Sequence, residues 1–123
     1  MSHSFYGIDH IQLAAPDGSE DLERKFFHDM LGMEEIDKPG NLKKRGGLWF
    51  RCGEHQIHIG IEHDFKPAKK AHPAIRVRDI ESLKELLSTN GIPVDEGEKL
   101  PGAKRFYVSD PFGNRIEFLE WTE

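Results

Sequence analysis

An internal duplication is the feature that most constrains the fold of this chain. Apolar residues alternate along strands and recur at helical spacing in the same order twice, which predicts two β-α-β-β-β modules. In the first half we expect a helix with apolar residues from Leu22 to Met30, and strands over 5–14, 33–37, 48–52 and 56–62. In the second half we expect a helix with apolar residues from Ile80 to Leu87, and strands over 72–77, 92–94, 105–109 and 115–121.

Shared landmarks support the duplication. Leu31-Gly32-Met33 and Asn90-Gly91-Ile92 end the two predicted helices at a spacing of 59 residues. Asp17 with Glu20 predicts a capping box before the first helix, and Asp79 predicts the N-cap of the second. A half of about 60 residues is marginal as a separate core. The halves are therefore expected to pack together, or to exchange between two chains, with a module over about 5–62, a linker over 63–71 and a module over about 72–121.

Composition excludes several classes of function. The chain has 123 residues, of which 37% are hydrophobic, and this suits one domain over 1–123. The net charge of −5 argues against a nucleic-acid partner, because phosphate binding usually requires a basic face. No apolar run approaches the length of a membrane helix. Cys52 is the only cysteine, so no disulfide forms within the chain, and a cytoplasmic location is expected.

Strand parity places four metal-ligand side chains at related positions of the two halves. In the strand over 56–62, Ile57, Ile59 and Ile61 share one face, which leaves His58 on the other. His10 and His72 lie in the first strand of each half, and His58 and Glu117 lie in the last. Three imidazoles and one carboxylate suit one divalent ion of zinc, nickel, iron, manganese or cobalt.

These residues carry a family resemblance over about 5–121. The chain resembles the vicinal oxygen chelate superfamily, also called the glyoxalase, bleomycin resistance and dioxygenase superfamily. The segments that carry it are Ile8-Asp9-His10-Ile11, Leu31-Gly32-Met33, Gln56-Ile57-His58-Ile59, His72-Pro73-Ala74-Ile75 and the run from Asp110 to Phe118. The resemblance implies an α+β fold of two tandem βαβββ modules, in which a mixed sheet forms a cup with the helices outside.

The resemblance also implies a metal centre and a homodimer. Its four metal positions fall on His10, His58, His72 and Glu117, and a shift of two residues would place Gln56 at the second position instead. Relatives of the dioxygenase type use only the equivalents of His10, His72 and Glu117. The ligands would come from one chain or from two, depending on whether the modules exchange.

Three functions follow as alternatives. The first is a metal-dependent lyase or isomerase that chelates two neighbouring oxygens of a small substrate, with Glu117 or a metal-bound hydroxide as the base. The second is a metal-free protein that binds an antibiotic or a metabolite, and the third is an extradiol-type dioxygenase. The residues expected to contact a substrate are Gln12, Gln56, Arg76 and Tyr107. The absence of a Gly-x-Gly-x-x-Gly segment argues against hydride transfer.

Overall fold

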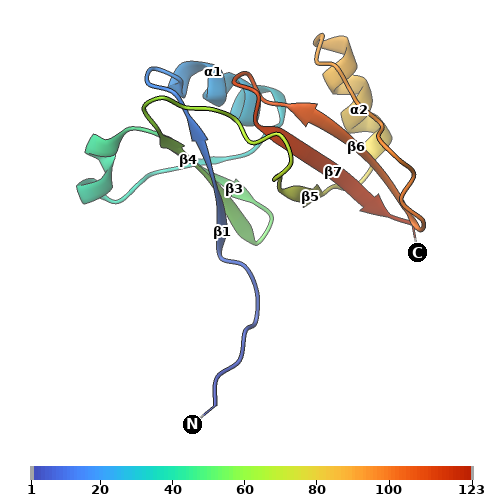
Figure 1. Ribbon diagram of the computed structural model, residues 1–123, viewed down its shortest axis with the longest axis horizontal. Coiled ribbons are helices and arrows are strands. Elements are labelled where there is room, and N and C mark those ends of the chain that lie inside the picture. Colours follow the sequence, from blue (N-terminus) through green and yellow to red (C-terminus); the bar gives the residue numbers. More distant parts are fainter. Residues whose placement is uncertain (1, 123) are drawn as a thin grey trace. The chain divides into compact units, whose positions relative to one another are not determined.

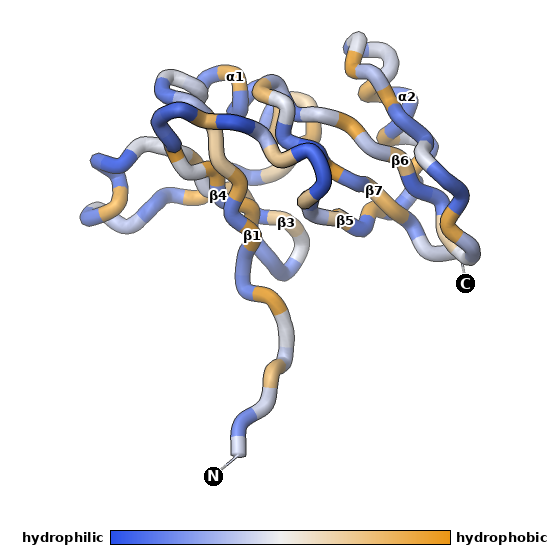
Figure 2. The backbone as a smooth tube through the Cα atoms, in the orientation of Figure 1, coloured by the Kyte–Doolittle hydropathy of each residue, from blue (hydrophilic) through white to orange (hydrophobic). Residues whose placement is uncertain are grey.

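The computed structural model in Figure 1 describes residues 2–122. They form two compact units, which divide between Phe65 and Lys66, and each unit has its own sheet. In Figure 2 the connection between the two sheets is largely blue, as expected for a polar segment. Among the described residues, no helix combines the length and the apolar character needed to cross a membrane.

The first unit is built on a four-stranded mixed sheet in the order β1-β4-β3-β2. Its strands are β1 (His10–Ala15), β2 (Glu35–Ile36), β3 (Leu48–Cys52) and β4 (His55–Ile61). β1 lies parallel to β4, and β3 lies antiparallel to β4 and β2. The helical segments are α1 (Glu20–Arg24), which continues into the π-helical η1 (Lys25–Met30), and the 3-10 helix η2 (Gly40–Arg45).

One face of this sheet packs against the helical segment. Ile57 and Ile59 are buried on β4, and Phe50 is buried beside them on β3, all on one face of the pleat. Phe27 of η1 stacks on Phe50, with ring centroids 5.4 Å apart. The apolar side chains thus fill one face of the sheet, and the polar side chains of β1 and β4 occupy the other.

The second unit repeats this pairing with three strands in the order β5-β7-β6. Its elements are β5 (Ala74–Arg76), α2 (Ile80–Thr89), β6 (Ala103–Ser109) and β7 (Arg115–Trp121). β5 lies parallel to β7, and β6 lies antiparallel to it. The predicted α+β fold is confirmed, and its strands form two small mixed sheets, one in each unit.

Hydrogen bonds fix the start of α2. The Asp79 side chain accepts from the backbone N–H of Ser82, as predicted for an N-cap. The Glu120 carboxylate of β7 also accepts from the backbone N–H groups of Asp79 and Ile80. These contacts orient the helix over the sheet, where Ile80 and Leu87 are buried.

The first strand is shorter than predicted. We expected a strand from residue 5, but β1 begins at His10, and Phe5 and Tyr6 are exposed. The register explains the difference, because His10 pairs with Gln56 and β4 begins only one residue earlier. Residues before Asp9 therefore have no strand of β4 to pair with.

Two other local predictions are wrong. No strand forms over 92–94, and a single bridge joins the next residue, Asp95, to Tyr107. Pro93 lacks an N–H and cannot complete a strand ladder. The capping box before α1 is also not formed, since Ser19 is the N-cap and makes no side-chain capping bond. The Glu20 carboxylate instead accepts from the backbone N–H of Gly47, a contact between distant segments that local sequence does not reveal.

Candidate functional site

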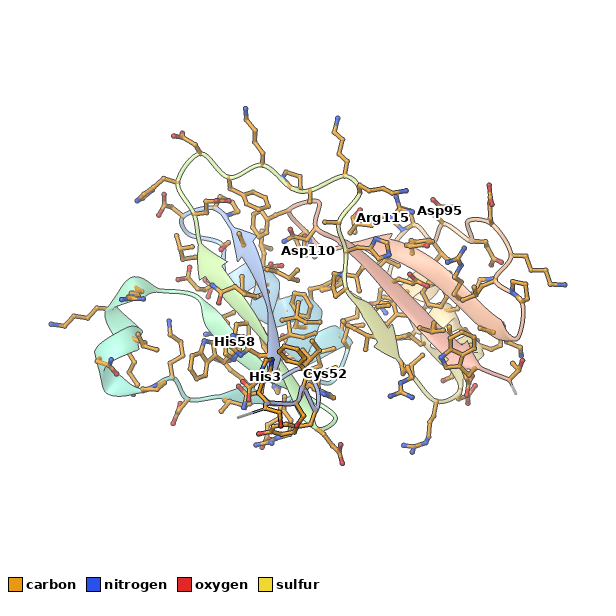
Figure 3. The ribbon with its side chains drawn as sticks, turned by 60° about the horizontal axis from the view of Figure 1, so that its bottom comes forward. His3, Cys52, His58, Asp95, Asp110 and Arg115 are labelled. Atoms are coloured by element: carbon orange, nitrogen blue, oxygen red, sulfur yellow. The ribbon has the colours of Figure 1, made fainter. Side chains whose placement is uncertain are left out.

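The polar face of the first sheet carries a stack of three rings. His58 of β4 lies between Trp49 of β3 and His10 of β1, with ring centroids 4.0 Å and 4.1 Å away. The strand register produces this stack, because His58 pairs with Trp49 on one side and with Gln12 on the other. Figure 3 labels His58 on this sheet.

The environment of His58 favours the neutral form of its ring. The side chain is buried, and burial lowers the pKa of its imidazole below the ordinary value. The neighbouring His10 and Lys38 lower this pKa further, and Asp9 opposes them. A neutral imidazole is the form that binds a metal ion.

Two further side chains orient these histidines. Gln56 Oε1 lies 2.8 Å from His58 Nε2, on the same face of β4. Asp9 Oδ2 lies 2.8 Å from His10 Nδ1. Hydrogen-bonded neighbours of this kind fix the orientation of ligand rings in metal proteins.

The second unit pairs the other two predicted ligands. His72 Nε2 lies 3.0 Å from Glu117 Oε1, and the Glu117 side chain is largely buried. The second Glu117 oxygen lies 3.5 Å from a terminal nitrogen of Arg105. This carboxylate is thus held between an imidazole and a guanidinium group.

The contacts of His72 fit a bound cation. Its Nδ1 lies 2.8 Å from the Lys70 carbonyl oxygen, and its Nε2 faces the Glu117 carboxylate. Both neighbours are acceptors, whereas a neutral imidazole has only one N–H to donate. A neutral ring therefore donates to only one of them and presents a lone pair on its other nitrogen, the position where a metal ion would bind.

Aromatic and cationic side chains surround this pair. The Tyr107 ring lies 5.2 Å from the His72 ring, edge to face. The guanidinium of Arg115, labelled in Figure 3, lies 4.1 Å from the Tyr107 centroid. Arg76, another predicted substrate contact, lies on β5 and is exposed. It shares a face with Glu117, since Ala74 pairs with Glu117 and Arg76 lies two residues further along β5.

The strand registers make His58 the counterpart of Glu117. Gln12, two residues after His10, pairs with His58. Ala74, two residues after His72, pairs with Glu117. On the other side, Trp49 pairs with His58 and Tyr107 pairs with Glu117. By the same count Gln56 corresponds to Arg115, so the duplication favours His58 over Gln56 as the second ligand.

Each unit therefore brings together two of the four predicted ligands. His10 lies with His58, and His72 lies with Glu117. Within residues 2–122, no three side chains of histidine, cysteine, aspartate or glutamate are grouped closely enough to hold a metal ion. The observed geometry is thus that of two pairs, each within its own unit.

Sequence reasoning missed three side chains at these pairs. Trp49, which the sequence analysis did not single out, stacks on His58. Arg105 contacts Glu117, and Arg115 covers Tyr107. Strand parity could have identified both arginines. Arg105 lies two residues before Tyr107 on β6, and Arg115 lies two residues before Glu117 on β7, so each shares a face with that residue.

Comparisons with known proteins give the family. Residues 7–118 match the family profile described as the Glyoxalase/Bleomycin resistance protein/Dioxygenase superfamily. This chain belongs to that superfamily. The match covers both candidate pairs of ligands, so the predicted family is confirmed.

A solved relative supports the same assignment. The chain is 55% identical to a glyoxalase family protein from Bacillus anthracis, with a TM-score of 0.95, over 98% of this chain and 99% of the other. The comparison with curated proteins found no match to this chain.

More distant structures share the fold. A lactoylglutathione lyase from Agrobacterium tumefaciens is 23% identical, with a TM-score of 0.72, over 93% of this chain and 92% of the other. A glyoxalase/dioxygenase from Nostoc punctiforme is 19% identical, with a TM-score of 0.77, over the full length of both chains. At these identities the likeness concerns the fold alone.

Proposed function

We propose that this glyoxalase-family protein is a metal-dependent enzyme that acts on a small, oxygen-rich substrate. The observation that carries the proposal is the contact between His72 Nε2 and Glu117 Oε1, where both nitrogens of one imidazole face acceptors. A structural histidine of the core would ordinarily face one donor or one acceptor that it can satisfy when neutral.

The proposed ligands are His10, His58, His72 and Glu117. The stack of His10 on His58 and the lowered pKa of His58 support neutral imidazoles in the first unit. Zinc, nickel, iron, manganese and cobalt all accept this mixture of nitrogen and oxygen ligands. The chemistry that such an ion supplies is that of a Lewis acid for two neighbouring substrate oxygens.

The residues of the chain would handle the proton and the orientation of the substrate. We propose Glu117 as the group that takes a proton next to a substrate carbonyl, because Arg105 and His72 hold its carboxylate in place. Tyr107 and Gln12 lie beside the proposed ligands in their own units and are proposed to contact the substrate. Gln56 and Arg76 complete the proposed set, on the same faces as the ligands. This arrangement suits lyase or isomerase chemistry.

A homodimer is part of the proposal. Phe5, Tyr6 and Ile8 precede β1 and are at least 62% exposed. Exposed apolar side chains in one short segment are typical of a contact surface. We therefore expect light scattering to give twice the mass of one chain, and a monomer at micromolar concentration would remove this part of the proposal.

The reaction is tested with metal-loaded protein and two probes. Protein reconstituted with each of the five ions is mixed with methylglyoxal and glutathione, whose adduct is a hemithioacetal, or with catechol in the presence of oxygen. We expect conversion of the hemithioacetal to an α-hydroxythioester by at least one loaded form. Oxygen uptake with catechol would instead favour the dioxygenase.

Glu117→Gln separates metal binding from proton transfer at this position. An amide can still bind a metal ion but cannot take the proton, so metal content should stay near the unmodified value while turnover falls by about 100-fold or more. Unchanged turnover in this variant would contradict the role of Glu117. Failure of every ion to bind would contradict the proposed function and favour a metal-free binding protein.

A further inference from the structure

A cavity opens in the first unit beside Trp49, the residue that stacks on His58. Its volume is about 260 Å³. The side chains that define it include those of Gln12, Lys38, Arg45 and Trp49, and two backbone positions without a Cβ also line it, Gly46 and Gly60. This volume lies below the usual 300–1,000 Å³ range of ligand pockets, so the cavity suits one group of a ligand rather than a whole large molecule.

Gly60 gives the cavity an open floor. A Cβ at this position would lie 2.3 Å from Gln12 Nε2. The missing side chain therefore lets the Gln12 amide lie across β4, where its polar atoms border the cavity. A larger residue at position 60 would push Gln12 out of this place.

The charge of the cavity is positive. Lys38 and Arg45 both line it, and within residues 2–122 neither forms an ion pair with a carboxylate. Lys38 donates a hydrogen bond to the Gly46 carbonyl oxygen, which leaves further N–H groups on its ammonium. The nearby Glu20 carboxylate accepts from the Gly47 N–H on the same loop. The chain as a whole has a net charge of −5, but the charged side chains that line this cavity are positive.

We infer that this cavity binds an oxyanion group of the substrate, a carboxylate or a phosphate, through Arg45, Lys38 and the amide of Gln12. The planar fork of Arg45 matches either group, and the Lys38 ammonium adds a second positive charge. The inference rests on the proposed function for the identity of the bound molecule as a substrate.

The cavity is adjacent to the proposed ligands of its unit. Trp49 forms its wall and also stacks on His58 at 4.0 Å. Gln12 pairs with His58 across the sheet. An oxyanion in the cavity would therefore place the remainder of the substrate beside the ring of His58.

Tryptophan fluorescence tests this inference directly. The chain has two tryptophans, so Trp121→Phe leaves Trp49 in the cavity wall as the single reporter. Chelator-treated Trp121→Phe protein is titrated with mandelate, phenyl phosphate and the neutral mandelamide. We expect saturable binding of at least one anion, weakened by salt, and at least about tenfold weaker binding of mandelamide. Mandelate and phenyl phosphate distinguish the two kinds of oxyanion.

Variants locate the binding. Arg45→Gln and Lys38→Met should each lower the affinity for the preferred anion by about tenfold, because each variant removes a charged hydrogen-bond donor. Lys44→Gln is the matched control, since Lys44 belongs to the same 3-10 helix but does not line the cavity. Equal binding of mandelamide, equal losses in Lys44→Gln and Arg45→Gln, or no saturable anion binding would each overturn the inference.

A second comparison separates this inference from the proposed function. His72→Ala alters a proposed metal ligand of the other unit, so anion binding in the chelator-treated protein should be unchanged. Anion binding without metal uptake by any form of the protein would leave the oxyanion site standing and refute the metal enzyme. Metal uptake together with no effect of Arg45→Gln on anion binding would support the metal enzyme and refute the oxyanion site.

Discussion

His58 and Gln56 show how far residue-level reasoning reaches in this chain. Parity placed both side chains on one face of β4, and their hydrogen bond confirms it. Parity could not choose between them as ligand, because a shift of two residues keeps the face unchanged. The strand registers provide the missing information by matching His58 with Glu117.

The different positions of these two residues predict graded losses of metal affinity. His58→Ala removes a proposed ligand and should lower affinity by more than about 100-fold. Gln56→Ala removes only a side chain that orients the ligand ring, so the loss should be about tenfold. Competitive titration with a chromophoric chelator measures both. A larger loss in Gln56→Ala than in His58→Ala would reverse the assignment.

The lowered pKa of His58 predicts an acid-sensitive apoprotein. Because burial lowers this pKa in the folded state, the unfolded chain binds a proton first as the pH falls. The free energy of unfolding of the metal-free protein should therefore decrease below about pH 6.5, the ordinary histidine value. Urea denaturation between pH 7.5 and 5.5 measures this decrease. His58→Gln should show a smaller decrease, and an identical one would assign the effect to other groups.

Elements were predictable where the local pattern agrees with the long-range pairing. β3 and β7 have the predicted bounds, and Asp79 caps α2 as expected. The strand predicted over 5–14 began too early. Its first residue depends on where the partner strand β4 begins, and local sequence does not reveal that position. The contact of Glu20 with Gly47 was missed for the same reason.

The Glu120 contact predicts a pH-dependent helix start. Backbone N–H groups of Ile80 and Asp79 lower the pKa of the Glu120 carboxyl. Its contribution to stability is therefore present above about pH 4.3, the unfolded value, and is lost as the pH falls through the lower folded value. Glu120→Gln should lower the Tm at pH 7 by a few degrees and by less at pH 3.5. Glu85→Gln, in the exposed middle of α2, is the control and should leave the Tm nearly unchanged. Equal shifts in both variants would contradict the capping role.

The turn before β3 predicts a strong dependence on one glycine. Gly47 has a φ of 87°, and a Cβ there would lie 2.1 Å from the Ile59 carbonyl oxygen. Gly53 has a φ of 60°, but a Cβ there would meet nothing within 4 Å. Gly53→Ala should therefore cost about 1–2 kcal/mol for the left-handed backbone alone. Gly47→Ala should cost at least about 2 kcal/mol more in chemical denaturation. Similar costs would show that the backbone at Gly47 relaxes freely.

At the scale of the whole molecule, the duplication was the most informative pattern. It predicted the repeated order of elements, and the structure adds the repeated pairing, in which a parallel pair of strands is flanked by an antiparallel one. It also predicted a histidine in the first strand of each unit. His10 begins β1 as expected, but His72 lies two residues before β5.

Function was less predictable than fold because many reactions use the same superfamily scaffold. The sequence indicated candidate ligands, and the structure adds the contact of His72 with Glu117 and the cavity lined by Lys38, Arg45 and Trp49. Neither the ion nor the reaction follows from these positions, since all five candidate ions accept the same ligands.

Metal content tests the central proposal most directly. Tag-free protein is purified without chelator or nickel resin, and plasma mass spectrometry measures its metals beside a His72→Ala variant. His63→Ala is the matched control, since His63 is exposed and pairs with Asp17. We predict about one divalent ion per chain, retained in His63→Ala and lost in His72→Ala. No bound metal after reconstitution with each of the five ions, or equal content in all three proteins, would contradict the proposed metal centre.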